Sequence, residues 1–114
     1  KIHIIKPGRH YLDSHDLNSH KSPRYKYNLE QFKKLQDPDP NTNNWDSWKD
    51  FLSNKNHPKN NHLAAINIIN KNNYGTLSTN FIALPNDPKN VLKPMYLFND
   101  NTNSNKDYYS VKTK

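Results

Sequence analysis

The sequence contains no cysteine in its 114 residues. It can therefore form no disulfide, no thiolate metal site and no cysteine nucleophile from its own side chains. Long apolar runs are also missing, because none approaches the ~18 residues that a membrane-spanning helix requires. Residues 1–20 lack the apolar stretch of a secretory signal peptide, since Ile4 and Ile5 form an apolar run that is far too short. We expect no membrane span.

Apolar side chains are scarce throughout the chain. Hydrophobic residues make up 32% of it, below the ~45–50% typical of globular domains. Asparagine and lysine take their place, and a core would be thin for one domain of this length. We therefore expect residues 1–114 to be a single domain or a fragment of a larger layered domain. Another polypeptide chain, or a missing segment, would then cover part of the apolar surface.

Arginine is also in short supply, with only Arg9 and Arg24 in a chain of formal net charge +7. The charge permits a nucleic acid as partner by Coulomb attraction. Arginine reads phosphates and bases better than lysine, and the lysines are spread along the chain. A small basic nucleic-acid-binding protein is therefore an alternative hypothesis and not the first one.

What the chain does contain is one long apolar region, residues 62–84. Residues 63–69 are apolar at both alternating positions, which predicts a strand covered on both faces. Residues 71–75 hold two asparagines and a glycine, which predict a turn. Residues 76–84 predict a second strand, and Pro85 ends it because proline cannot donate to a ladder. Such a hairpin is barely stable alone, so we expect further layers around it.

A first amphipathic helix is predicted over residues 24–36. Ser22 and Pro23 form its start, with serine as the N-cap and proline at the first helical position. Apolar side chains recur at spacings of three and four and give the helix one apolar face. The Asp-Pro-Asp-Pro run that follows ends it, because residues before proline avoid the helical region.

A second helix is predicted over residues 45–53. Trp45 and Trp48 both lie on its apolar face, and we expect that face to pack on the sheet. The alternative for this pair is an aromatic platform for bases or a ligand.

The N-terminal and C-terminal thirds are less regular. Residues 1–6 predict a short strand, and residues 9–21 a polar loop anchored by Tyr11 and Leu12. Residues 91–98 predict a third strand, at a sheet edge because it contains Pro94. A last short strand is expected over residues 108–111, within an irregular tail that covers residues 99–114.

Histidines in the N-terminal loop recur every five residues, at His10, His15 and His20, with Asp13 and Asp16 between them. These residue types suit zinc or another divalent ion. An interval of five does not keep side chains on one helical face, so we expect a solvated loop with no metal site and no cofactor.

A second histidine pair, His57 and His62, flanks a proline-containing loop. A histidine nuclease would need an orienting group and a metal carboxylate or asparagine at defined geometry. The sequence fixes no such geometry, and no catalytic residue is assigned.

The predicted elements define a fold class. Two helices and a hairpin that is apolar on both faces predict an α/β (α+β) fold. We expect an antiparallel sheet of about three to four strands with two helices packed on one face. The second face would need another sheet or a partner, as in a layered αββα-type body.

Residues 9–109 resemble the C-terminal part of linear amide C–N hydrolases of the N-terminal-nucleophile superfamily. The branches concerned are the penicillin acyltransferase-like, acid ceramidase-like and NRDE proteins. The motifs that carry the resemblance are Tyr-Gly-Thr-Leu-Ser-Thr at residues 74–79 and Ser-Pro-Arg-Tyr at residues 22–25.

The resemblance implies a function, but two features of the family's active site are missing from this chain. Such enzymes use a cysteine, serine or threonine made N-terminal by processing, whereas this chain begins with Lys1, and Arg9 stands where the family has asparagine before His10. The chain would then be the non-nucleophile portion of an amide hydrolase, supplying sheet and pocket walls around His10 and Tyr11. Together with Arg24, these are the candidate substrate-binding residues.

A structural subunit of a larger assembly is the remaining hypothesis. Its asparagine- and lysine-rich loops would fill gaps between neighbouring chains. Whether the chain belongs to an enzyme depends on a partner segment, because its own sequence holds no complete catalytic set.

Overall fold

The computed structural model describes residues 2–69, 71–89, 91–101 and 107–112. The elements follow in the order α1 (Pro23–Lys34), η1 (Pro40–Thr42), α2 (Asp46–Leu52), η2 (His62–Ala64), β1 (Thr79–Ala83), β2 (Met95–Asn99) and β3 (Tyr109–Ser110). The chain is a mixed α+β protein with a three-stranded antiparallel sheet in its described part. The predicted fold class is confirmed, and no helix of the described residues is long and apolar enough to cross a bilayer.

The first helix starts as its sequence predicts. The Ser22 hydroxyl accepts a hydrogen bond of 3.0 Å from the backbone N–H of Tyr25, and proline occupies the first helical position. The helix ends at Lys34, two residues earlier than expected. The reason is a contact with α2: Gln36 donates its backbone N–H to the Ser47 hydroxyl (3.1 Å), and its carbonyl accepts the Trp48 indole N–H (2.9 Å).

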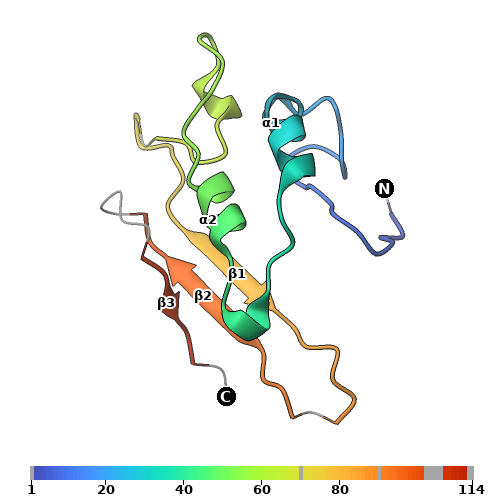
Figure 1. Cartoon of the computed structure of the whole chain (residues 1–114). Helices are drawn as coiled ribbons and strands as arrows, with labels where there is room; N and C mark the ends of the chain where they lie inside the picture. Colours follow the sequence, from blue (N-terminus) through green and yellow to red (C-terminus); the bar gives the residue numbers. More distant parts are fainter. Residues whose placement is uncertain (1, 70, 90, 102–106, 113–114) are drawn as a thin grey trace.

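The described residues form two apolar core clusters. The helical cluster lies between α1, α2 and the N-terminal loop, and its most buried members are Tyr25, Phe32 and Phe51. The sheet cluster lies between α2 and one face of the sheet, and consists of Trp45, Phe81, Leu97 and the side chains around them. Figure 1 shows α2 between α1 and the sheet.

Trp48 and Leu52 of α2 contact both clusters. The predicted packing of the tryptophan face on the sheet is therefore confirmed. The helix α2 lies on the sheet, and α1 packs on the other side of α2, so both helices are on the same side of the sheet but only α2 contacts the sheet cluster.

The sheet has the order β1-β2-β3 with antiparallel neighbours. Its register places Phe81 opposite Leu97 and Phe98 opposite Tyr109. The strand predicted over residues 91–98 begins only after Pro94, at Met95, and it lies in the centre of the sheet. The predicted edge position was wrong, because the proline lies outside the strand and β3 pairs with the far side of β2. The last strand expected over residues 108–111 is present as β3.

The strand predicted over residues 63–69 is absent. This segment begins as η2, which packs on α1, and the Asn28 amide donates to the Ala64 carbonyl at 2.9 Å. Ala64 and Ala65 are 0% and 1% exposed, because their small side chains allow the backbone to approach the helix. The apolar residues at both alternating positions of this segment therefore reflect burial against α1 and not a strand between two layers.

The predicted turn after this segment is confirmed. Asn72 and Asn73 adopt positive φ values of 53° and 62°, and Lys71 pairs with Tyr74 across the turn. The following strand β1 starts at Thr79, later than predicted, because Thr76 is hydrogen bonded to Ile68 through both its backbone N–H and its hydroxyl.

Two predictions for the N-terminal region were wrong. Residues 2–6 form no strand, because no described strand lies beside them to pair with, and Ile2 and Ile4 are 100% and 91% exposed. Leu12 is 70% exposed and does not anchor the loop, whereas Tyr11 packs into the helical cluster. Of the tail over residues 99–114, residues 102–106 and 113–114 lie outside the described part.

Candidate functional site

The structure brings two of the three candidate binding residues together. The Tyr11 ring lies 5.0 Å from that of Tyr25, and Arg24 lies close enough for its charge to act on the Tyr11 hydroxyl while it donates to the Leu63 carbonyl at 3.3 Å. Burial raises the pKa of Tyr11 above its usual 10.0, although the charge of Arg24 partly opposes the rise. The Tyr11 hydroxyl therefore stays protonated at neutral pH, so this pair can bind a polar group but offers no general base.

His10 lies apart from this pair. The Asn18 amide donates to Nδ1 of His10 at 3.0 Å, which leaves the ring proton on Nε2, and that nitrogen donates to the Lys6 carbonyl at 2.8 Å. Its ring is therefore bonded within the N-terminal loop. The role of His10, Tyr11 and Arg24 as substrate-binding residues stays a prediction.

A serine, an aspartate and a histidine meet at the start of α1. The Ser22 hydroxyl donates to one oxygen of Asp13, while His15 approaches the other oxygen with its backbone N–H (2.8 Å) and its ring Nδ1 (3.0 Å). In a nucleophilic triad the histidine lies between serine and carboxylate. Here the carboxylate lies between the other two, and Ser22 is only 1% exposed. The cluster caps the helix and has no nucleophile.

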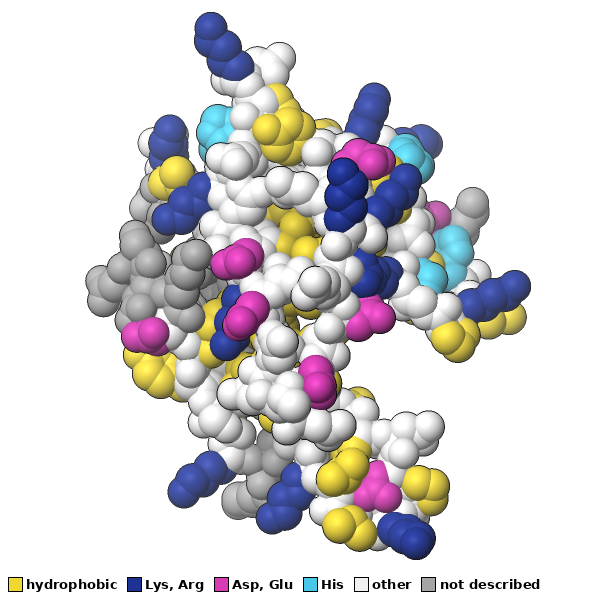
Figure 2. Space-filling model, in the orientation of Figure 1, with side chains coloured by type: hydrophobic (Ala, Val, Ile, Leu, Met, Phe, Trp, Pro, Cys, Tyr) yellow, Lys and Arg dark blue, Asp and Glu magenta, His cyan; other side chains and the backbone are white. Residues whose placement is uncertain are grey.

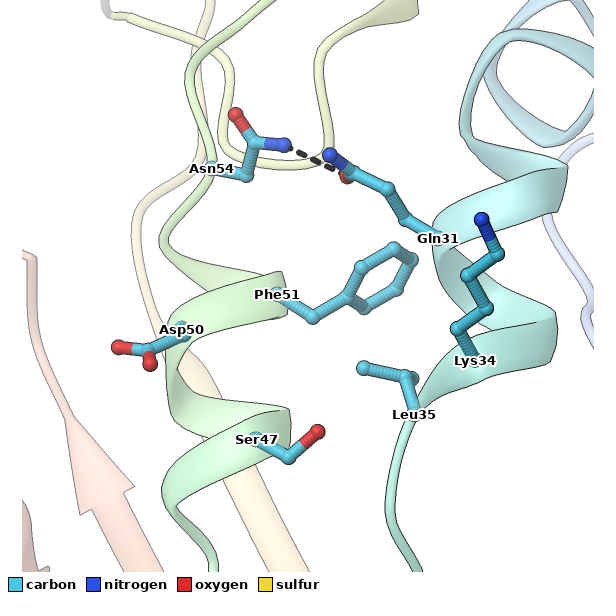
Figure 3. A pocket seen from close by; sticks show the side chains of 7 residues that line it. All are labelled: Gln31, Lys34, Leu35, Ser47, Asp50, Phe51 and Asn54. Atoms are coloured by element: carbon cyan, nitrogen blue, oxygen red, sulfur yellow. Dashed lines mark hydrogen bonds between the residues drawn. The ribbon is translucent and has the colours of Figure 1, made fainter.

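A groove of about 390 Å³ lies between α1 and α2. Figure 3 shows Phe51 and Leu35 pointing toward each other across it, while the Asn54 amide donates to Gln31 at 2.9 Å at one end. Asp50 points away from the space. The remaining lining residues are Lys34 and Ser47. The groove can hold an apolar group, but nothing in it pairs a nucleophile with a base.

The second face of the sheet carries apolar side chains that are exposed or half-buried and lie outside both core clusters. Strand alternation puts five residues on it, which we name the outer sheet face: Ile82, Tyr96, Phe98, Tyr109 and Val111. None belongs to either core cluster. Ile82 and Tyr109 are 65% and 59% exposed, whereas Phe81 and Leu97 on the inner face are both 6% exposed.

The sequence could have revealed the outer sheet face only in part. Residues 79–83 and 95–99 alternate between two sets of side chains, which is the signal of two faces. Both sets are largely apolar, so the sequence could not tell which face α2 covers. The groove has no sequence signal, since its walls come from two helices whose packing is a tertiary property.

No protein-family model, curated protein or solved structure matches this chain. The fold described above is therefore established by the structure, and the hydrolase resemblance stays a prediction.

Proposed function

We propose that the chain is the non-nucleophile portion of an amide (C–N) hydrolase of the N-terminal-nucleophile type, supplying a sheet, its helical layer and pocket walls. The outer sheet face is the observation that supports this proposal. A sheet with helices on one face and apolar side chains on the other has the composition of one half of an αββα body, in which a second sheet packs about 10 Å away.

The energy of burial supports a partner on this face. Fully burying a large apolar side chain stabilises a protein by about 1.5–3 kcal/mol. Monomeric proteins seldom leave a contiguous apolar surface uncovered, and such surfaces usually mark a binding site. The exposed Ile82 and Tyr109, with the half-buried Tyr96 and Phe98 of β2 between them, are therefore a surface that another polypeptide would cover.

The division of chemical roles follows from the residues present. Ser22, whose hydroxyl donates to the carboxylate of Asp13, is buried and caps α1, and Ser14 meets His15 only at Nδ1, at 3.5 Å. The nucleophile would therefore come from the partner. Tyr11 and Arg24 would form part of the pocket wall, because a guanidinium and a neutral phenol both donate to the carbonyl oxygen of an amide.

Native mass spectrometry of the protein from its natural source tests this proposal. We expect a complex of fixed stoichiometry with a second polypeptide that begins with cysteine, serine or threonine, and amidase activity in that complex. A lone species of 13.4 kDa would contradict the proposal.

Matched variants locate the contact. Ile82→Ser combined with Tyr109→Ser should abolish the complex, because both side chains lie on the outer sheet face. Leu12→Ser is the control, since Leu12 is 70% exposed on the N-terminal loop, away from the sheet. Equal complex formation by the double variant and the control would show that the partner binds elsewhere.

A structural subunit of a larger assembly is the second candidate, and the same outer sheet face favours it. The two candidates differ in the partner, which would then have no N-terminal nucleophile and no amidase activity. A nucleic-acid role has less support, because the Lys and Arg side chains on the face shown in Figure 2 are spread around it and interleaved with Asp and Glu side chains.

A further inference from the structure

The loop between α2 and η2 brings together two histidines that are five positions apart in sequence. The rings of His57 and His62 lie 6.4 Å apart between centroids, at an interplanar angle of 79°, and both residues are exposed. Figure 1 shows this loop at the end of the molecule farthest from the sheet. It is therefore separate from the outer sheet face, and Asn54 at the start of the loop is its residue at the groove.

The first ring is oriented by the backbone. Nδ1 of His57 lies 2.8 Å from the Pro58 carbonyl oxygen, and a carbonyl oxygen can only accept, so Nδ1 carries the proton. The same carbonyl accepts the backbone N–H of Asn61 at 3.0 Å, which closes the loop into a turn. The Nε2 lone pair of His57 is therefore available. In a metal-bound histidine, the ring nitrogen that does not bind the metal usually donates its proton to a carbonyl, a carboxylate or water.

The backbone that follows the second histidine is anchored to α1. His62 is the first residue of η2, and the carbonyls of the next two residues, Leu63 and Ala64, accept hydrogen bonds from Arg24 and Asn28 of α1. Both histidines are thus held from short, hydrogen-bonded segments. Exposed rings at this separation can turn to present one nitrogen each to a single cation, since a zinc–nitrogen bond is about 2.0–2.1 Å long.

We propose that His57 and His62 form a two-histidine site for a zinc-like divalent cation, with water completing the coordination. Imidazole ligands suit zinc and its neighbours in the first transition row. No group of three or more His, Cys, Asp or Glu side chains gathers in the described part of the chain, so the site keeps open positions. Lys55 and Lys59 in the same loop repel a cation, but exposed charges are screened within about 8 Å at physiological salt.

Calorimetric titration of the full-length chain with Zn²⁺ tests the site. We expect one saturable event that His57→Ala and His62→Ala each weaken by more than about tenfold, because even the loss of an outer-shell partner costs ~10–100-fold. The matched control is His20→Ala, which removes an exposed histidine of the N-terminal loop and should leave the affinity unchanged. Both loop variants should keep the circular dichroism spectrum of the parent chain.

The bound nitrogen gives a second, independent readout. Nitrogen NMR of the zinc-loaded chain should identify Nε2 of His57 as the ligand, because Nδ1 is engaged by Pro58. Any of three results would overturn the proposal: coordination through Nδ1, equal zinc affinity in the two variants and the parent, or the absence of saturable binding.

Discussion

The helical half of this protein, formed by the N-terminal loop, α1 and α2, buries an aromatic core between its own elements, whereas the sheet half, β1 to β3, buries only one of its two apolar faces. In the helical half Tyr25, Phe32 and Phe51 are at most 9% exposed. In the sheet half Phe81 is 6% exposed, but its strand neighbour Ile82 is 65% exposed. The difference shows that the helical half has a core of its own and that the sheet half presents an apolar face for a further layer.

Polar contacts follow the same division. Arg9 donates to the carbonyls of Phe32 and Lys33, both at 3.2 Å, and pairs with Asp37 at 2.7 Å. A guanidinium in this position satisfies carbonyls that the end of α1 leaves unpaired and complements its dipole. Ser22 caps the other end of the helix. The helical half thus supplies its own caps, and we expect it to keep its structure without a partner.

The largest effect should come from the centre of the helical half. Phe32→Ala should lower the free energy of unfolding by about 3–5 kcal/mol, because its ring contacts Tyr25, Phe51 and Trp48. Urea unfolding followed by circular dichroism measures the loss. Tyr27→Ala on the same helix is the control, since Tyr27 is 47% exposed and should change stability by less than half of that amount. Similar losses for both variants would mean that the helical half has no core of its own.

The two faces of the sheet should differ nearly as much. Leu97→Ala should cost about 2–5 kcal/mol, because the side chain is buried in the sheet cluster. Ile82→Ser should stay within about 0.5 kcal/mol in the isolated chain, as is usual for exposed positions. Thermal unfolding of both variants tests the contrast. A large loss for Ile82→Ser in the isolated chain would mean that the outer sheet face is already covered.

A smaller effect is expected at the N-cap of α1. Ser22→Ala should cost about 0.5–2 kcal/mol, because it removes the acceptor for the backbone N–H of Tyr25. Ser19→Ala, outside the helix, is the control. Urea midpoints of the two variants give the comparison, and equal midpoints would show that the cap contributes nothing to the helical half.

The smallest effect is a dependence of the stability of the helical half on pH. Burial raises the pKa of Asp13, but hydrogen bonds from Ser22 and His15 and the charge of His15 outweigh it and lower the pKa below its usual 3.8. A carboxyl whose folded-state pKa is lowered stabilises the fold fully above its unfolded value. This contribution is lost as the pH falls below 3.8 through the folded-state pKa.

Acid titration of Asp13→Asn measures this contribution. The variant should be less stable than the parent at pH 6, and the difference should shrink below pH 3.8. A constant difference over this range would show that the Asp13 charge does not stabilise the loop. Asp87→Asn is the comparison at an exposed carboxyl outside the helical half. The pKa of Asp87 is also lowered, by a backbone hydrogen bond from Leu92.

The sequence predicted the elements whose signals are local. The serine and proline at 22 and 23 gave the start of α1, and the two asparagines at 72 and 73 gave the turn, because capping and positive φ depend on one or two residues. Residues 63–69 were misassigned as a strand, since a short apolar run is equally compatible with any buried segment. For the candidate site, only the chemistry of Tyr11 and Arg24 was visible; their contact was not.

The amino-acid sequence by itself determined the composition of the layers: an absence of thiols, two amphipathic helices, a proline-bounded strand and a thin apolar core. Tertiary structure alone decided which layer meets which. Residues 63–69 lie against α1 because two alanines allow a close approach that no alternation pattern encodes. The helix α2 lies on the face of Phe81 and leaves the face of Ile82 open, because both faces are apolar and only the packing of Trp45 and Trp48 distinguishes them.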